Sequence, residues 1–202
     1  MARRKEHTHE EIREMAITAV VDHLAHHPLS SLSLRKVATA IGYVPSTLIN
    51  IFGSYQALLL SVSELTLQQL HQSLNLVEDQ DNAEAIVAMA KVYSGFALAH
   101  PHRFNLVFEL KMLDDNLPPL HSKLIRALFG LVESRLSALF DYTEQQLLQK
   151  HSRVIWAGIH GLTCLALDDK LFIEDTTLDD LLHCHVDSHL TAMGYQKDLI
   201  CC

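Results

Sequence analysis

The sequence lacks the features that mark membrane proteins, secreted proteins and several large enzyme classes. It contains no run of about 18 uncharged apolar residues and no signal-peptide pattern at its Arg-Arg-Lys start. We therefore expect a soluble, cytoplasmic protein with no membrane partner. A phosphate-binding glycine loop, a nucleophile elbow and an HExxH motif are also missing. The protein is predicted not to be an enzyme, with no catalytic residue, no cofactor and no metal site.

Cysteine is scarce, and strand-like alternation of apolar and polar residues is nowhere sustained. The four cysteines, at positions 164, 184, 201 and 202, have neither metal-binding nor redox spacing. Cys164 and Cys184 are expected to pack as small apolar side chains. Apolar residues make up 49% of the 202 positions, enough for a substantial core in one or two domains. The patterns favour an all-α fold.

Charge is divided unevenly along the chain. Residues 1–56 hold six lysines and arginines against five acidic residues, a net charge of +1. The remainder holds ten basic and nineteen acidic residues, a net charge of −9. An acidic body repels phosphate and would help to confine any nucleic-acid contact to the N-terminal part.

The segment 33–58, SLRKVATAIGYVPSTLINIFGSYQAL, predicts two short helices joined by a glycine turn. Ser33 is a potential N-cap, and apolar residues follow it at helical spacing, at positions 34, 37, 38 and 41. Gly42 suits the left-handed position that ends a helix. Pro45 suits the first turn of the next helix, because that position needs no backbone N–H.

Two helices joined in this way are typical of a helix-turn-helix DNA-binding unit, although an ordinary helical hairpin has the same pattern. Leu48 and Phe52 would pack on the first helix and leave polar side chains facing outward. In such units the second helix lies in the major groove and its N-terminal residues meet base edges. The predicted DNA-contacting residues are Ser33, Arg35, Lys36, Tyr43, Ser46, Thr47, Asn50 and Ser54.

The order of the neighbouring elements resembles one family. An amphipathic helix at about 8–26, with a capping-box pattern at Thr8 and Glu11, precedes this segment, and Phe-Gly-Ser then leads into a long helix. Residues 8–70 resemble the N-terminal domain of the TetR family of regulators. The resemblance implies a three-helix DNA-binding head at 8–70 and a helical ligand-binding and dimerisation body at 71–196.

Three positions depart from the family's pattern. Ile49, Ile51 and Tyr55 stand where members usually carry a Tyr, a His or Tyr, and a Lys, which commonly touch phosphates. Phosphate contacts supply most of the sequence-independent affinity for DNA. We therefore expect weaker or less salt-dependent binding. The candidate substitutes for the missing phosphate contacts are Ser33, Arg35, Lys36, Ser54 and the basic residues at 3–5.

The segment 153–167, RVIWAGIHGLTCLAL, carries two apolar stripes at helical spacing. One contains Trp156 and His160, with Thr163 or Cys164, and the other contains positions 155, 159, 162 and 166. Two apolar faces need two partners, so one is expected to face the chain's own interior and the other a second subunit. The small residues at 157, 158 and 161 would allow helices to approach closely, although a helical glycine costs about 1 kcal/mol relative to alanine.

The Trp-x-x-x-His-Gly pattern in this segment also resembles the C-terminal domain of a subset of the TetR family. The family resemblance implies a homodimer formed by the last two long helices, at about 143–168 and 176–193. A two-fold dimer would read an approximately palindromic operator. A monomer whose last helices only close the core is the alternative.

An apolar effector pocket is the second functional prediction. Apolar side chains with a few polar groups are the usual lining of a small-molecule site, although the same stripe can be plain core. The predicted ligand-contacting residues are Met89, Tyr93, Phe96, Phe104, Phe108, Trp156 and His160. An effector that prefers a conformation with misaligned heads would lower operator affinity.

Taken together, the patterns predict a ligand-responsive transcriptional regulator, a repressor that binds operator DNA as a homodimer and is released by a small molecule. Two alternatives remain open. One is a dimeric ligand-binding or interaction protein with impaired DNA binding, given Ile49, Ile51 and Tyr55. The other is a zinc-responsive sensor that uses His185 and His189, which are four residues apart on one helical face.

Overall fold

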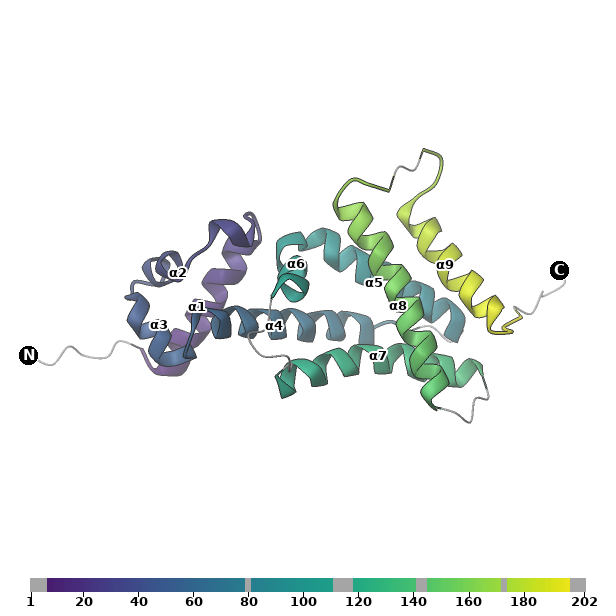
Figure 1. The fold of residues 1–202 in the computed structure, drawn as a ribbon, viewed down its shortest axis with the longest axis horizontal. Coiled ribbons are helices and arrows are strands. Elements are labelled where there is room, and N and C mark those ends of the chain that lie inside the picture. Colours follow the sequence, from purple (N-terminus) through teal and green to yellow (C-terminus); the bar gives the residue numbers. More distant parts are fainter. Residues whose placement is uncertain (1–6, 79–80, 111–117, 141–144, 172–173, 197–202) are drawn as a thin grey trace, which may run out of the picture. The chain divides into compact units, whose positions relative to one another are not determined.

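The computed structural model describes residues 7–78, 81–110, 118–140, 145–171 and 174–196. These residues form nine α-helices and one 3-10 helix and contain no strand, which confirms the predicted all-α fold. The chain divides into two compact units, residues 1–68 with 100–121 and residues 69–99 with 122–202 (Figure 1). The helix α4 (Tyr55–Asn75) passes from the first unit into the second.

The first unit contains α1 (His9–Leu24), the 3-10 helix η1 (Leu29–Ser31), α2 (Leu34–Ala40), α3 (Pro45–Phe52) and α6 (Pro101–Glu109). The predicted capping box begins α1: the Thr8 hydroxyl accepts from the Glu11 N–H, and the Glu11 carboxylate accepts from the Thr8 N–H. Every fourth residue of α1 is buried, and this stripe packs with α2 and α3 around one core. The buried residues of α1 are Ile12, Ala16, Val20 and Leu24.

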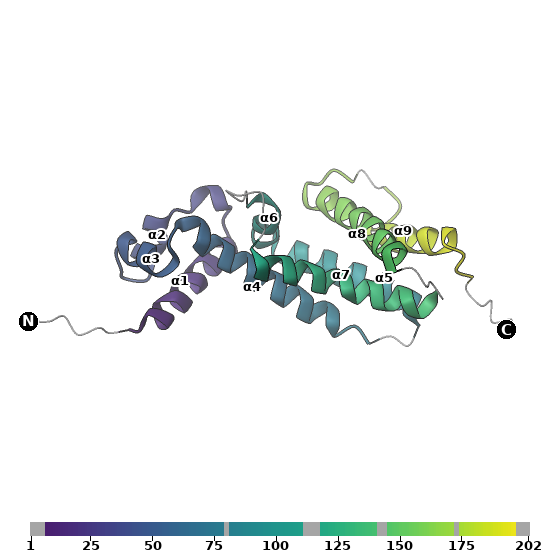
Figure 2. The same cartoon turned by 60° about the horizontal axis from the view of Figure 1, so that its bottom comes forward.

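The second unit contains the end of α4, then α5 (Asn82–Ala99), most of α7 (Pro119–Leu139), α8 (Gln145–Leu167) and α9 (Leu178–Ala192). The helices α5, α8 and α9 pack side by side (Figure 2). A capping box of Thr177 and Asp180 begins α9, as its spacing predicts. Ile155 and Ile159 of α8 lie in the interior, together with Thr163. Thr163 therefore belongs to the buried stripe, whereas Trp156 and His160 are half-buried.

One packing expectation is wrong. Cys184 is exposed, because α9 turns the buried residues Leu182 and Val186 towards the core and position 184 falls on the opposite side of the helix. Cys164 is half-buried. No single described helix is long and apolar enough to cross a membrane; α3 and α4 meet that test only as a pair bent by 64°.

Candidate nucleic-acid interface and ligand site

The turn between α2 and α3 has the geometry that the glycine predicts. Gly42 adopts a φ of +76°, a left-handed value that L side chains rarely take. The Tyr43 N–H donates to the Ala38 carbonyl at 2.8 Å, and the Gly42 N–H donates to the Thr39 carbonyl at 3.1 Å. These two bonds form a Schellman motif, which ends α2 and redirects the chain. Pro45 then occupies the first turn of α3, as predicted.

One face of α3 lies in the core of the first unit, and three polar side chains lie outside that face. Leu48 and Phe52 are buried, as predicted. Ser46 and Asn50 are exposed and Thr47 is half-buried. The unit therefore presents short hydrogen-bonding side chains on its second helix, next to the turn.

A shallow depression beside α2 gathers three of the predicted DNA-contacting residues. The residues that line it are Ser33, Arg35, Lys36, Thr39 and Ala40. The Lys36 ammonium group donates to the Ser31 carbonyl at 2.6 Å, which holds this cation at the N-terminal edge of α2. Thr39 was missed by the sequence analysis, although its spacing of four from Arg35 places it on the same face of α2.

Three predicted DNA-contacting residues also bond within the first unit. The Tyr43 hydroxyl makes a hydrogen bond with the His7 imidazole, at 2.9 Å to Nδ1. The Ser54 hydroxyl accepts from the Ala57 N–H at 3.0 Å and so caps the first turn of α4. Ser33 caps α2 in the same way. These side chains help to set the position of the two helices, and their contact with DNA stays a prediction.

The three departures from the family's pattern have different surroundings. Ile49 is 39% exposed on α3. Ile51 and Tyr55 are half-buried and pack against the core of the first unit. The Tyr55 hydroxyl is buried without a hydrogen bond to any described residue, and burial raises the pKa of this phenol. Positions 51 and 55 therefore add apolar packing to the core.

Three of the predicted ligand-contacting residues meet in the second unit. Tyr93 of α5 is only 5% exposed, and its hydroxyl makes a hydrogen bond with Nδ1 of His160 at 2.9 Å. The His160 ring stacks on the Trp156 indole, with centroids 5.0 Å apart and an angle of 11° between the planes. The Cys164 sulfur lies 3.4 Å from Nε2 of the same imidazole. The stripe at Trp156 and His160 is thus joined to α5 by a polar contact.

The other predicted ligand-contacting residues are divided between the units. Met89 is buried and Phe96 is half-buried on α5, in the second unit. Phe104 and Phe108 belong to α6 in the first unit, with ring centroids 5.1 Å apart. Phe104 is buried in that unit and Phe108 is 46% exposed. The proposed lining of one pocket by all seven residues stays a prediction.

The cluster around His160 carries no formal charge at neutral pH. Burial lowers the pKa of His160 and so favours the neutral imidazole. Burial also raises the pKa of the Tyr93 phenol and of the Cys164 thiol. Beside this cluster, the Ser94 and Thr163 hydroxyls share a hydrogen bond of 2.6 Å, and Thr163 donates to the Ile159 carbonyl. The arrangement offers hydrogen bonds to a ligand but no strong electrostatic attraction.

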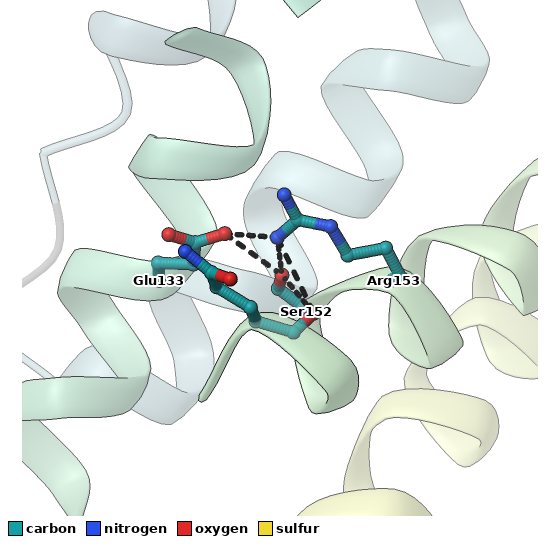
Figure 3. Close-up of polar contacts among 4 residues, drawn as sticks. Glu133, Ser152 and Arg153 are labelled. Atoms are coloured by element: carbon teal, nitrogen blue, oxygen red, sulfur yellow. Dashed lines mark hydrogen bonds and ion pairs between the residues drawn. The ribbon is translucent and has the colours of Figure 1, made fainter. Parts of the chain in front are cut away.

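A charged contact joins α7 to α8. Figure 3 shows that the Arg153 guanidinium contacts both the Glu133 carboxylate and the Ser152 hydroxyl. The same guanidinium lies 4.2 Å above the Phe129 ring, a cation–π contact. The Phe129 and Trp156 rings in turn make a T-shaped contact, with centroids 5.5 Å apart. Contacts therefore run continuously from Glu133 on α7 to the stacked pair on α8.

The histidines of the zinc alternative have protein partners. His185 Nε2 makes a hydrogen bond of 3.0 Å with the Ile155 carbonyl, and its ring lies against Gly158, where a Cβ atom would come within 2.2 Å of it. His189 Nε2 makes a hydrogen bond of 3.0 Å with His151 Nδ1. Within the part of the chain that the structure describes, no three His, Cys, Asp or Glu side chains are grouped as a metal would require.

The fold and the turn define an all-helical protein with an N-terminal helix-turn-helix unit. Residues 86–189 match the family described as "Tetracyclin repressor-like, C-terminal domain", which is more than half of the chain. The chain therefore belongs to the TetR family. No curated protein sequence matches it.

Several solved structures share this fold. A protein of unknown function from Rhodococcus sp. RHA1 superposes with a TM-score of 0.77 at 19% identity, over 94% of this chain and 98% of its own. A TetR transcriptional regulator from the same organism gives 0.68 at 14% identity, over 91% and 98%. Thermus thermophilus FadR, a TetR family repressor in complex with lauroyl-CoA, gives 0.63 at 16% identity, over 94% and 99%. The matched family and the relatives with a stated role are regulators rather than enzymes.

Proposed function

We propose that this protein is a ligand-responsive transcriptional repressor that binds a palindromic operator as a homodimer and is released by a small molecule. The observation that carries the proposal is the α2–α3 unit. A Schellman turn ends α2 there, and α3, which has exposed polar residues, follows it. Membership of the TetR family supports it. The proposal assigns DNA binding to residues 8–70, and dimerisation and effector binding to residues 71–196.

In the proposed complex α3 lies in the major groove. Ser46, Thr47 and Asn50 meet base edges there, because short polar side chains at the start of a recognition helix reach that depth. Arg35 and Lys36 border the depression beside α2 and contact phosphates. Ser33, Tyr43 and Ser54 complete the proposed surface.

The proposed dimer uses α8 and α9. Val154, Ala157, Gly161 and Leu165 recur at helical spacing on α8, away from its buried stripe. Val154 is 52% exposed and Leu165 is 44% exposed. An exposed apolar stripe on a long helix is a suitable surface for an isologous contact with a second copy.

The effector is proposed to act by selecting one conformation of the dimer. A small molecule can shift operator binding only by the difference between its affinities for the two states. Met89, Tyr93, Phe96, Phe104, Phe108, Trp156 and His160 stay the proposed ligand-contacting residues. FadR, a relative in fold, has lauroyl-CoA bound, which is an acyl thioester.

Fluorescence anisotropy tests the DNA-binding part of the proposal. The protein is titrated into DNA from upstream of its own gene and into a scrambled duplex, at roughly 50 and 200 mM salt. Asn50→Ala should lose selectivity for the upstream DNA, by about 1–3 kcal/mol if one base contact is removed. Asn105→Ala, which changes an exposed residue of α6, is the matched control.

Equal, feeble binding to both duplexes would overturn DNA reading by this head. It would favour the second candidate, a dimeric ligand-binding or interaction protein. The observation behind that candidate is the exposed apolar surface at Ile49 and at Val44, which is 59% exposed directly before α3. Sedimentation of the protein alone separates the dimer from DNA binding, because Leu165→Glu should yield monomers if α8 forms the interface.

A further inference from the structure

Two branched apolar side chains at α3 are exposed. Val44 is 59% exposed and Ile49 is 39% exposed. Val44 is the N-cap of α3, a position that favours Ser, Thr, Asp or Asn, and it makes no side-chain cap bond. Leu48 and Phe52 already supply the buried face of this helix. Neither helix capping nor core packing therefore accounts for the two exposed side chains.

These apolar side chains lie directly beside the polar ones. Pro45 and Ile49 are four residues apart, so they lie in one row along α3, and Val44 immediately precedes that row. Ser46 and Asn50, also four apart, form the neighbouring row, and both are exposed. The helix thus presents an apolar row next to a hydrogen-bonding row. We call Val44 and Ile49 the apolar edge of α3.

The major groove of DNA has groups that match both rows. Base edges there present hydrogen-bond donors and acceptors, and each thymine adds an apolar C5-methyl group. The N-terminal residues of a recognition helix are the ones that meet these edges. A protein partner typically covers about 800 Å² on each side, far more than two side chains provide. The apolar edge therefore fits methyl groups in a duplex better than it fits a protein surface.

The chemistry of Ile49 also agrees with the departure from the family's pattern. An isoleucine cannot donate to a phosphate, as the usual tyrosine at this position does. Contact with a methyl group buries apolar surface and releases no counterions, so its contribution to affinity does not depend on salt. Such a contact supplies affinity at the position where a phosphate contact is missing.

We propose that Val44 and Ile49 contact thymine methyl groups in the major groove and so select operators that carry thymine at the matching positions. This inference rests on the proposed function. It names the base that the apolar edge of α3 reads, beside the bases that meet Ser46, Thr47 and Asn50.

Uracil substitution tests the contact, because it removes only the C5-methyl group and keeps base pairing and the O4 acceptor. The wild-type protein is titrated by fluorescence anisotropy into the upstream duplex with thymidine and into the same duplex with deoxyuridine. We expect affinity to fall about four-fold for each contacted methyl group, which corresponds to about 0.8 kcal/mol. The fall should be the same at roughly 50 and 200 mM salt.

Variants of the apolar edge locate the contact. Val44→Ala and Ile49→Ala change exposed side chains and should each reduce the loss caused by uracil. The double variant should bind the thymidine and deoxyuridine duplexes equally, as a cycle between protein and DNA requires. Leu76→Ala is the matched control: this side chain is 76% exposed but belongs to the second unit, and the variant should keep the full uracil effect.

The outcomes separate this inference from the proposed function. Selective binding of the upstream duplex with no uracil effect overturns the inference alone. A uracil effect that the double variant retains overturns the assignment to Val44 and Ile49. Equally feeble binding to upstream and scrambled duplexes, with either base, overturns both the inference and the proposed function, and a protein partner then accounts better for the apolar edge.

Discussion

The contact between Gly158 and His185 makes a sharp prediction about stability. A Cβ atom at position 158 would lie 2.2 Å from two atoms of the His185 ring and 2.8 Å from a third, so Gly158→Ala must displace the imidazole. Displacement breaks its hydrogen bond to the Ile155 carbonyl, worth about 0.5–1.5 kcal/mol, and overpacks the contact between α8 and α9 by about 1–3 kcal/mol. The gain in helix propensity offsets about 1 kcal/mol of this.

The expected net effect of Gly158→Ala is a destabilisation of about 1–3 kcal/mol. The matched control is Gly95→Ala at an exposed position on α5, where an added Cβ would have no atom within 4 Å beyond its chain neighbours and the backbone of its own helix. That variant should gain up to about 1 kcal/mol. Urea unfolding at a fixed protein concentration measures both, and Trp156, the one tryptophan in the sequence, reports directly on α8.

A double-mutant cycle identifies the cause. In a His185→Ala background the ring is gone, so Gly158→Ala should no longer destabilise and should show the helix-propensity gain alone. The reasoning is refuted if Gly158→Ala and Gly95→Ala shift the unfolding midpoint in the same direction by the same amount. It is also refuted if Gly158→Ala destabilises the His185→Ala protein as much as it destabilises the wild-type protein.

Two further predictions concern a cap and a buried imidazole. Thr177→Ala removes the N-cap of α9 and should destabilise the protein by about 1 kcal/mol, whereas Thr191→Ala, an exposed change on the same helix, should have little effect in urea unfolding. Hydrogen bonds from Thr177 lower the pKa of Asp180, so the stabilisation by this cap should decrease as the pH falls through that lowered pKa. If Thr177→Ala destabilises the protein as much at acid pH as at neutral pH, this reasoning is wrong. Burial lowers the pKa of His160, so the unfolded chain takes up more protons here than the folded chain once the pH falls below about 6.5. Stability should be full above that value and fall below it. His160→Gln should flatten part of that fall between pH 7.5 and 5.5, and a pH profile identical to that of the wild-type protein would contradict this assignment.

The features that the sequence predicted well depend on residues close together in the chain. The capping boxes at Thr8 and Thr177 each involve residues three apart, and the Schellman turn at Gly42 involves six consecutive positions. Such contacts depend on local backbone geometry, so residue type and spacing are enough to predict them. Helix ends were accordingly predicted to within a few residues; for example, the last helix was predicted at about 176–193, and α9 runs over Leu178–Ala192.

The all-α fold and the helix-turn-helix could be predicted from the sequence alone, because each follows from local spacing. The groups that meet across the chain are known only from the tertiary structure. It paired Tyr93 with His160, set His185 on Gly158 and placed Arg135 between Val77 and Asn82. Helical periodicity states that a face is apolar or polar, but the partner of that face depends on how the helices pack, which is a property of the whole fold.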